Sequence, residues 1–292
     1  MQNRSSIMFT SGKDVDMNKL SIQKRAQIIG MLVEGMSLRA TSRLADCSIN
    51  TVTKLLVDIG DAAWDYQDRT FRNLGCKRIQ CDEIWSFVYA KDKNATPEMK
   101  VEKRAGDVWT WTAIDADTKL IPCWQVGNRS AGMAKVFMYD LAARLDRRVQ
   151  LTTDGLRLYL NAVEGAFENK IDYAMLIKQY GDAPGTGPDH KYSSGDCCGA
   201  IKGAVCGNPD EAHISTSYVE RANLTMRMGM RRFTRLTNGF SKKVENHAAA
   251  VALHFMYYNF GRVHKTLRVT PAMEAGLADH VWTLEEIAGL VK

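Results

Sequence analysis

Hydrophobic residues recur at helical spacing through the N-terminal part of the chain and predict three short helices there. The expected segments are 21–35, 37–46 and 49–60; a serine begins each of the first two, and Gly60 ends the third. A tight turn at Cys47 and Ser48 separates the last two segments. This order predicts a helix-turn-helix over 17–60. Its expected core consists of Ala40, Leu44, Ile49, Val52, Leu55 and Leu56.

The third of these helices would carry the DNA contacts, because the last helix of such a unit lies in the major groove. A plain three-helix bundle has the same periodicity and remains an alternative. Asp46 stands where the turn often has glycine. The side chains expected to project into the groove are Asn50, Thr51, Thr53 and Lys54.

The pattern changes after residue 78, where β-branched and aromatic residues predict strands that alternate with amphipathic helices. The first three strands suggest an antiparallel group, with a hairpin between the second and the third. The later strands are separated by helices, as in parallel crossovers. The sequence therefore predicts an α/β protein with a mixed sheet flanked by helices. The expected strands are 78–90, 107–118, 119–127, 148–154 and 171–180, and the expected helices are 130–145, 155–167, 216–232, 241–259 and one from Thr283.

These elements suggest a division of the chain into segments. Residues 1–16 are expected to form a disordered leader, and the polar segment 61–78 a linker. The main domain would cover 79–262 and the tail 263–292. Segment 181–214 is rich in Gly, Pro and Asp, which predicts a long loop or insertion within the main domain.

Basic residues are concentrated late in the chain, although the net charge of the 292 residues is only +6. No acid lies between Arg221 and Lys243, and a segment of one charge sign favours a phosphate-binding surface. A second basic cluster near residue 265 is a further candidate for phosphate contacts. The residues expected to bind DNA in these two regions are Asn223, Arg227, Arg231, Arg232, Arg235, Lys242, Lys243, Arg262 and Lys265.

Composition points to a cytoplasmic protein. The N-terminal segment lacks the apolar stretch of a secretory signal, and the most apolar run, 247–260, is too short to span a bilayer. Seven cysteines, an odd number and mostly scattered, fit a reducing compartment better than a disulfide framework. We therefore expect no membrane partner.

Three acidic residues are candidates for chemistry. Asp82 interrupts an otherwise apolar strand, which suits either a metal ligand or an acid facing solvent at a sheet edge. Asp154 ends a strand, where ligands gather in α/β sheets, but Asp before Gly is also ordinary turn chemistry. Glu220 precedes the arginines and forms with Ser217 the pattern of a helix capping box. On a helix, Asn223, Arg227 and Arg231 would share the face of Glu220.

If the three carboxylates converge, they could bind two Mg²⁺ ions, because hard cations prefer oxygen ligands. Two such ions could activate a water or a 3′-hydroxyl and stabilise the leaving oxygen in phosphoryl transfer. A zinc site is a weaker alternative for the insertion, since the spacing there lacks a C-x₂-C pair, and a flexible insertion explains the same residues. Its ligands would be Cys197, Cys198, Cys206 and His213.

Three stretches resemble the DDE class of insertion-sequence transposases, in particular the bacterial family named from the first numbered insertion sequence. They are QCDEIWSFV, TTDGLRLY and TSYVERANLTMRMGMRRFTRL with the following FSKKVENH, and the resemblance runs from about residue 37 to about 275. It implies an RNase H-like catalytic fold and the triad Asp82, Asp154 and Glu220, with Arg227 as the accompanying basic residue. It also implies Mg²⁺ or Mn²⁺, cleavage at DNA element ends, transfer of the freed 3′-OH, and a homo-oligomer on double-stranded DNA.

Two other functions remain open at the level of sequence. A structure-selective nuclease of the same fold would cleave DNA without joining it. A non-catalytic regulator would combine the helix-turn-helix with a ligand domain, and it would leave three converging acids unexplained.

Overall fold

The centre of the molecule is a six-stranded mixed sheet in the order β3-β2-β1-β4-β5-β6. It is seen in a computed structural model that describes residues 19–181, 197–234 and 238–291. Strands β1 to β3 are antiparallel, β4 and β5 run parallel to β1, and β6 is antiparallel to β5. The predicted α/β class and mixed sheet are confirmed. The strands are β1 (Arg78–Val88), β2 (Gly106–Asp115), β3 (Cys123–Gly127), β4 (Gln150–Thr153), β5 (Asp172–Tyr180) and β6 (Cys197–Cys206).

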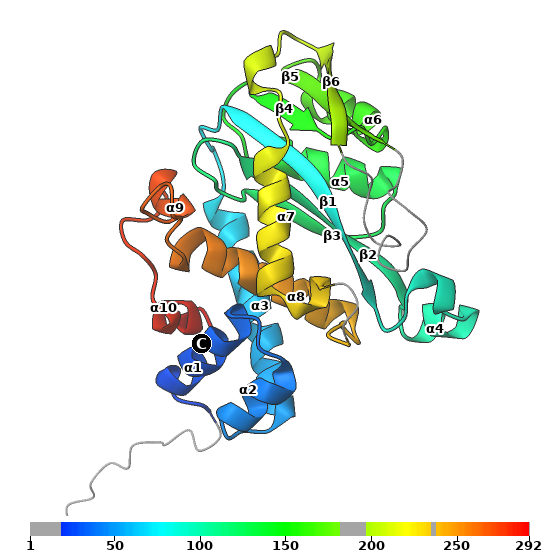
Figure 1. Ribbon diagram of the computed structural model, residues 1–292. Helices are drawn as coiled ribbons and strands as arrows, with labels where there is room; N and C mark the ends of the chain where they lie inside the picture. Colours follow the sequence, from blue (N-terminus) through cyan, green and yellow to red (C-terminus); the bar gives the residue numbers. More distant parts are fainter. Residues whose placement is uncertain (1–18, 182–196, 235–237, 292) are drawn as a thin grey trace, which may run out of the picture.

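Helices cover both faces of this sheet (Figure 1). Helices α5 (Ala131–Ala142) and α6 (Leu158–Phe167) lie on one face, and α7 (Ser217–Gly229) crosses β1 on the other. Helix α8 (Val244–Met256) lies beside the lower end of α7. Short helices complete the chain: α4 (Pro97–Glu102) near the β1–β2 turn, α9 (Pro271–Glu274), and α10 (Leu284–Gly289), which begins with a Thr283 capping box as predicted.

The three N-terminal helices are present, and a serine side chain caps each of them. They are α1 (Ile22–Val33), α2 (Leu38–Leu44) and α3 (Ile49–Thr70). The prediction that Gly60 ends the third helix is wrong, because α3 continues for ten residues into the expected linker. Gly60 lies inside the helix, where a Cβ would come within 2.5 Å of Ala249 in α8. The glycine allows two helices to approach closely rather than stopping one.

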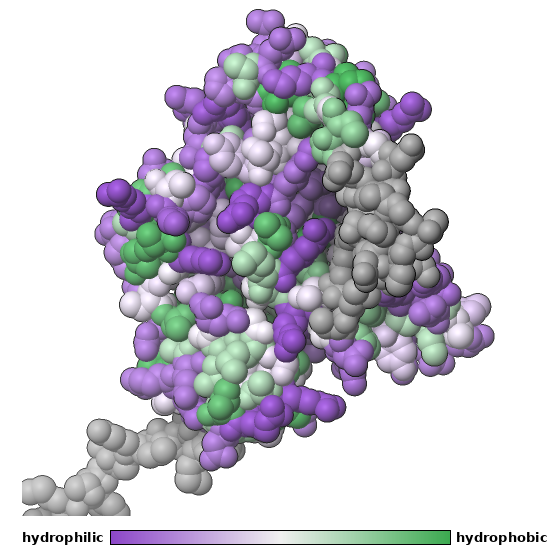
Figure 2. Space-filling view, viewed as in Figure 1, coloured by the Kyte–Doolittle hydropathy of each residue, from purple (hydrophilic) through white to green (hydrophobic). Residues whose placement is uncertain are grey.

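The small core of the three N-terminal helices differs in part from that predicted for a helix-turn-helix. It is formed by Ile28, Ala45, Val52 and Leu55, whereas Leu44 and Ile49 are exposed. Figure 2 shows hydrophobic side chains at the surface over these N-terminal helices. The turn before α3 contains Asp46 at φ 46°, a left-handed conformation that explains why glycine is common at this position.

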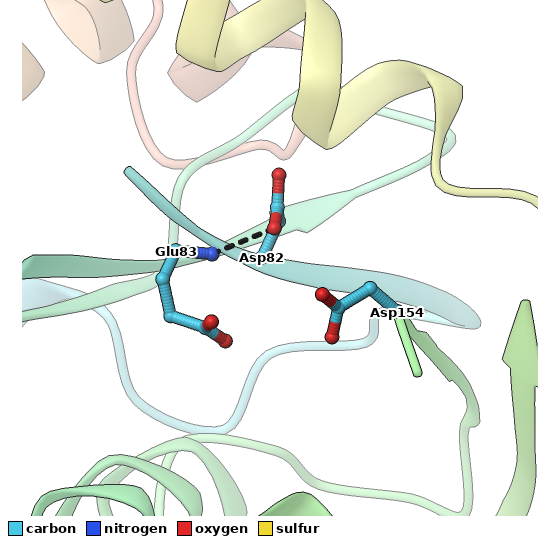
Figure 3. A group of neighbouring side chains, drawn as sticks. All are labelled: Asp82, Glu83 and Asp154. Atoms are coloured by element: carbon cyan, nitrogen blue, oxygen red, sulfur yellow. Dashed lines mark hydrogen bonds between the residues drawn. The ribbon is translucent and has the colours of Figure 1, made fainter. Parts of the chain in front are cut away.

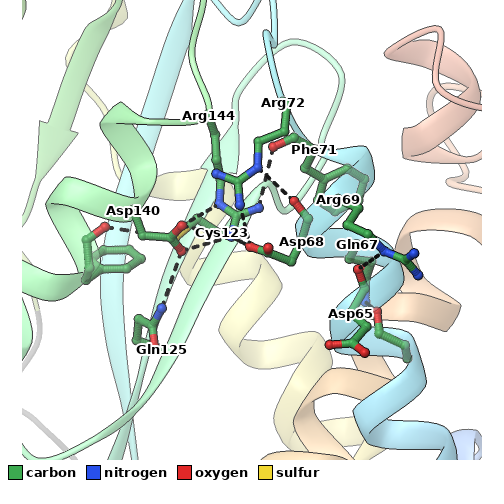
Figure 4. A network of polar contacts seen from close by, with 12 residues as sticks. Asp65, Gln67, Asp68, Arg69, Phe71, Arg72, Cys123, Gln125, Asp140 and Arg144 are labelled. Atoms are coloured by element: carbon green, nitrogen blue, oxygen red, sulfur yellow. Dashed lines mark hydrogen bonds and ion pairs between the residues drawn. The ribbon is translucent and has the colours of Figure 1, made fainter.

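The second half of α3 is fixed to the main domain by a buried arginine (Figure 4). Arg144, whose side chain is 6% exposed, donates to Asp68 in α3 at 2.6 Å and to Asp140 in α5 at 2.9 Å. The Cys123 thiol of β3 also donates to Asp140, at 3.0 Å. Apolar residues of α1 and α3 belong to the same core cluster as the sheet. The predicted DNA-binding unit is therefore packed onto the main domain.

The segment 181–214 is not simply a long loop. Residues 197–206 form β6, which pairs with β5, and a short 3-10 helix, Glu211–His213, follows. Cys197 and Cys206 lie at opposite ends of β6, about 30 Å apart at the rise of a strand, so one zinc ion cannot bind both. The four-ligand zinc site is therefore excluded. Among the described helices, none is both long and apolar enough to cross a membrane.

Candidate functional site

The strand order reverses between β1 and β4, and this is where two of the predicted acids meet. Strands β2 and β3 extend the sheet on one side of β1, and β4 to β6 extend it on the other. Cys81 in β1 pairs with Thr153, the last residue of β4. Asp82 and Asp154 are therefore neighbours at the end of β4. Ligand sites in α/β sheets form at such a reversal, beside the carboxyl ends of strands.

Asp82, Glu83 and Asp154 form a compact carboxylate group (Figure 3). One oxygen from each lies within 4.8 Å of the others. Asp82 points toward the side of the sheet where α7 lies, and Glu83 points toward the opposite side. Asp154 is held at the strand end by the backbone N–H of Leu156, which donates to its Oδ1 at 3.0 Å. Two of the three predicted acids are thus brought together, with Glu83 as the third member of the group.

Asp82 is oriented by two donors. The backbone N–H of Glu83 donates to Oδ1 and Asn223 Nδ2 donates to Oδ2, both at 2.8 Å. Burial raises the pKa of Asp82 to about 6, and the negative charges of Asp154 and Glu220 add to the rise. The site therefore concentrates negative charge on groups that are partly withdrawn from water. Asn223 is buried against Asp82, so its position differs from the DNA-contacting role expected from the sequence.

Glu220 lies in the first turn of α7, but the predicted capping box with Ser217 does not form. The cap residue of α7 is Thr216, and Gln80 Oε1 of β1 accepts from the N–H groups of Tyr218 and Val219, at 2.8 and 3.2 Å. A side chain from the central strand thus takes over the capping function.

The freed Glu220 side chain binds two other groups. Thr216 Oγ1 donates to its Oε1 at 2.6 Å, and Lys178 Nζ donates to its Oε2 at 2.5 Å. Glu220 lies outside the compact group, yet its negative charge contributes to the raised pKa of both Asp82 and Asp154. It is therefore electrostatically coupled to the acids, across the space between α7 and the sheet.

Glu83 is a site residue that the sequence analysis did not select. Its side chain is 1% exposed and pairs with Arg129, whose Nη2 lies 3.1 Å from Oε2. Burial raises the pKa of Glu83 to about 7, against the opposing effects of the Tyr159 hydroxyl and Arg129. The signal was present in the sequence, because Glu83 interrupts the same apolar strand as Asp82.

The acids fit a hard divalent cation. The donors are all carboxylate oxygens, which Mg²⁺ and Mn²⁺ prefer. Burial raises the pKa of Asp154 as it does that of Asp82, so the charged forms lack full compensation from water. A cation held by Asp82 and Asp154, with Glu220 or Glu83 as a further ligand, would supply that compensation.

A groove of about 830 Å³ lies between the N-terminal helices and the described residues that follow α7, 230–232 and 238–243. Apolar residues such as Leu32, Met230 and Phe240 line part of it, and Thr53 of α3 faces it. None of the described residues that line the groove is acidic. Its basic residues are Arg39, Arg231, Arg232, Lys242 and Lys243.

The groove residues do not continue the helix of Glu220. Helix α7 ends at Gly229, Met230 is extended, and Arg231 belongs to a separate 3-10 helix, Arg231–Phe233. The prediction that Arg231 shares the face of Glu220 is therefore wrong. Arg232 is half-buried and donates to Ser241 at 2.7 Å. Arg235 lies outside the described residues.

The other residues expected to bind DNA vary in accessibility. On α3, Asn50 and Lys54 are exposed, with Lys54 paired to Asp58. Thr51 and Thr53 are half-buried and bond within the helix, to Ser48 and to the carbonyl of Ile49. Arg227 is half-buried, whereas Arg262 and Lys265 are exposed.

In comparisons with known proteins, no family model matches this sequence, and no curated protein matches it.

Proposed function

We propose that this protein is a DDE transposase with an RNase H-like catalytic domain. The observation that carries the proposal is the meeting of Asp82 and Asp154 at the reversal of strand order, with Glu220 on the helix that faces them. The resemblance of the three sequence stretches selects these same acids. The basic groove at the other end of α7 also supports the proposal, because basic residues bind the phosphates of DNA.

In this proposal, Asp82, Asp154 and Glu220 hold two Mg²⁺ or Mn²⁺ ions. When bound, the ions would activate the attacking oxygen and stabilise the leaving oxygen. The protein's own groups supply orientation: Asn223 and the N–H of Glu83 fix Asp82, and Gln80 fixes the start of α7. At the scissile phosphate, a new P–O bond would form to the water or 3′-hydroxyl, which loses its proton to solvent, while the bond to the leaving 3′-oxygen breaks and that oxygen takes up a proton to become a hydroxyl.

Double-stranded DNA is the proposed substrate, bound along α7 between the acids and the groove. From Glu220 to Gly229, its last residue, helix α7 rises by about 14 Å. This length matches about four base pairs of a duplex. The groove joins Thr53 of the helix-turn-helix to the basic residues after α7, so both would contact the same DNA. Holding two element ends together would require a homo-oligomer.

Substitution of each acid tests the proposal. We expect Asp82→Asn, Asp154→Asn and Glu220→Gln to abolish cleavage and strand transfer in Mg²⁺ while leaving DNA affinity within about threefold, because the changes remove ligands and not phosphate contacts. Glu164→Gln, at an exposed position of α6, is the matched control and should retain activity. The assay supplies element-end DNA and a target plasmid.

Each outcome of this assay has a clear meaning. Cleavage without joined product by the unsubstituted protein would favour the structure-selective nuclease. DNA binding with neither cleavage nor metal dependence would favour the regulator. Full activity in any one of the three variants would refute the proposed triad.

A further inference from the structure

Lys178 lies where β5 extends beyond the end of β4. The last pair between these strands is Thr153 with Met175, so Lys178 is three residues past the end of the shorter strand. Residues 174, 176 and 178 share the face of the sheet on which Glu220 lies, because strand residues alternate. Lys178 reaches Glu220 across this face, with 31% of its side chain and 38% of the Glu220 side chain exposed.

The ion pair occupies a carboxylate that the proposed chemistry needs. One Glu220 oxygen accepts from Lys178 and the other from Thr216. At the same time Glu220 is coupled by charge repulsion to Asp82 and Asp154. The Lys178 ammonium group thus binds directly to Glu220, the acid that lies outside the compact group.

We propose that Lys178 is a positioning residue that holds Glu220 while the site contains no cation and releases it when a divalent cation binds. The inference rests on the proposed function, in which Glu220 is a ligand. Lysine suits this task because its ammonium is a point charge on a flexible stem, unlike the rigid fork of arginine. The partial exposure of the pair keeps the exchange reversible, since partly hydrated ion pairs are weak.

A consequence is that cation binding and the ion pair compete for Glu220. Removing the lysine charge should therefore strengthen cation binding, and the gain should require Glu220. If Lys178 acted only as a nearby positive charge, its removal would strengthen cation binding equally with and without Glu220. A double-substitution cycle separates these two cases.

The experiment measures Mn²⁺ affinity of the DNA-free, full-length protein by calorimetry. We expect Lys178→Met to bind Mn²⁺ about threefold to tenfold more tightly than the unsubstituted protein, the range for releasing a partly exposed ion pair. In the Glu220→Gln background, the same lysine substitution should change the affinity less than about twofold.

Lys202→Met is the matched control. Lys202 lies opposite Leu176 on β6, on the same face of the sheet, and donates to the carbonyl of Glu211 rather than to Glu220. Its removal should leave the Mn²⁺ affinity within about twofold, because it does not compete for a ligand.

An equal gain from Lys178→Met with and without Glu220, an equal gain from Lys202→Met, or no gain at all would overturn the role of Lys178. Failure of the unsubstituted protein to bind Mn²⁺, or binding unaffected by Asp82→Asn, would instead overturn the metal site itself and this inference with it. The two failures are therefore distinguishable in one set of titrations.

Discussion

Alternation along β1 divides its polar side chains between two layers of the molecule. Gln80 caps α7, and Asp82 on the same face accepts from Asn223 of that helix. Glu83, on the opposite face, pairs with Arg129. One strand thus fixes the start of α7 and supplies an acid to each side. The cap also sets where the first turn of α7, which carries Glu220, begins.

Burial of Asp82 makes the metal-free protein sensitive to pH. Its pKa rises from the ordinary value of 3.8 to about 6 on folding. A carboxyl with a raised folded pKa contributes stability below its unfolded pKa and loses that contribution as pH rises through the folded value. We expect the contribution of Asp82 to stability in EDTA to be lost between about pH 4 and pH 6, whereas the buried His247 and His254, whose pKa values are lowered to about 3 and about 4, add stability as pH rises over this range. Thermal unfolding of the unsubstituted protein and of Asp82→Asn across this range isolates the Asp82 contribution as the difference between them.

Asp82→Asn removes the titrating group and should remove this contribution to the profile. At pH 8 without metal, the variant should be more stable than the unsubstituted protein by about 1 to 2 kcal/mol, less than the full pKa shift implies because neighbouring acids relax. At pH 4 the difference should disappear. A variant that is less stable at both pH values would show that the ionised Asp82 carboxylate does not destabilise the metal-free protein.

At the level of secondary-structure elements, the close contact of α3 and α8 depends on Gly60. A Cβ there would lie 2.5 Å from the Cα of Ala249 and 2.6 Å from its carbonyl oxygen. Gly60→Ala should therefore destabilise the protein by about 1 to 3 kcal/mol, although alanine favours helices more than glycine by about 1 kcal/mol. Urea unfolding provides the measurement.

Gly132→Ala is the control for helix propensity. Gly132 is exposed in α5, and the nearest neighbour of an added Cβ is Ser130 Oγ at 3.8 Å. This substitution should stabilise the protein by up to about 1 kcal/mol. Equal effects of the two substitutions would contradict the close packing of α3 on α8.

The helix-capping serines and Gly60 also show what could be predicted from sequence. Helix starts at Ser21 and Ser37 were correct, because a cap depends on residues three positions away. The role of Gly60 was not, because it depends on a helix almost 190 residues later. The acids Asp82 and Asp154 could be selected from residue type and position in a strand. Their partners could not, since contacts such as that of Lys178 with Glu220 arise only when β5 and α7 are in place.

For the whole molecule, the main consequence of the fold is the union of two basic regions that are far apart in sequence. Arg39 of α2 lines one groove together with Arg231, Arg232, Lys242 and Lys243. This union requires the N-terminal helices to be fixed against the main domain, which Arg144 and the shared core achieve. The acids thus lie near the start of α7 and the basic groove near its end; in the proposed function, the first performs the chemistry and the second binds phosphate.

The groove predicts a specific salt dependence of DNA binding. Lys242 and Lys243 are exposed, and each phosphate contact contributes about 0.9 to the slope of log affinity against log salt. We expect Lys242→Ala with Lys243→Ala to lower DNA affinity and to reduce this slope by about 1 to 2. The control pair is Lys135→Ala with Lys170→Ala, which removes the same charge from exposed positions in α5 and just after α6. Fluorescence anisotropy between 50 and 200 mM salt, about the range in which such slopes are resolved, provides both quantities. If both pairs reduce the slope equally, DNA responds to net charge alone; if neither does, the groove does not bind the phosphate backbone.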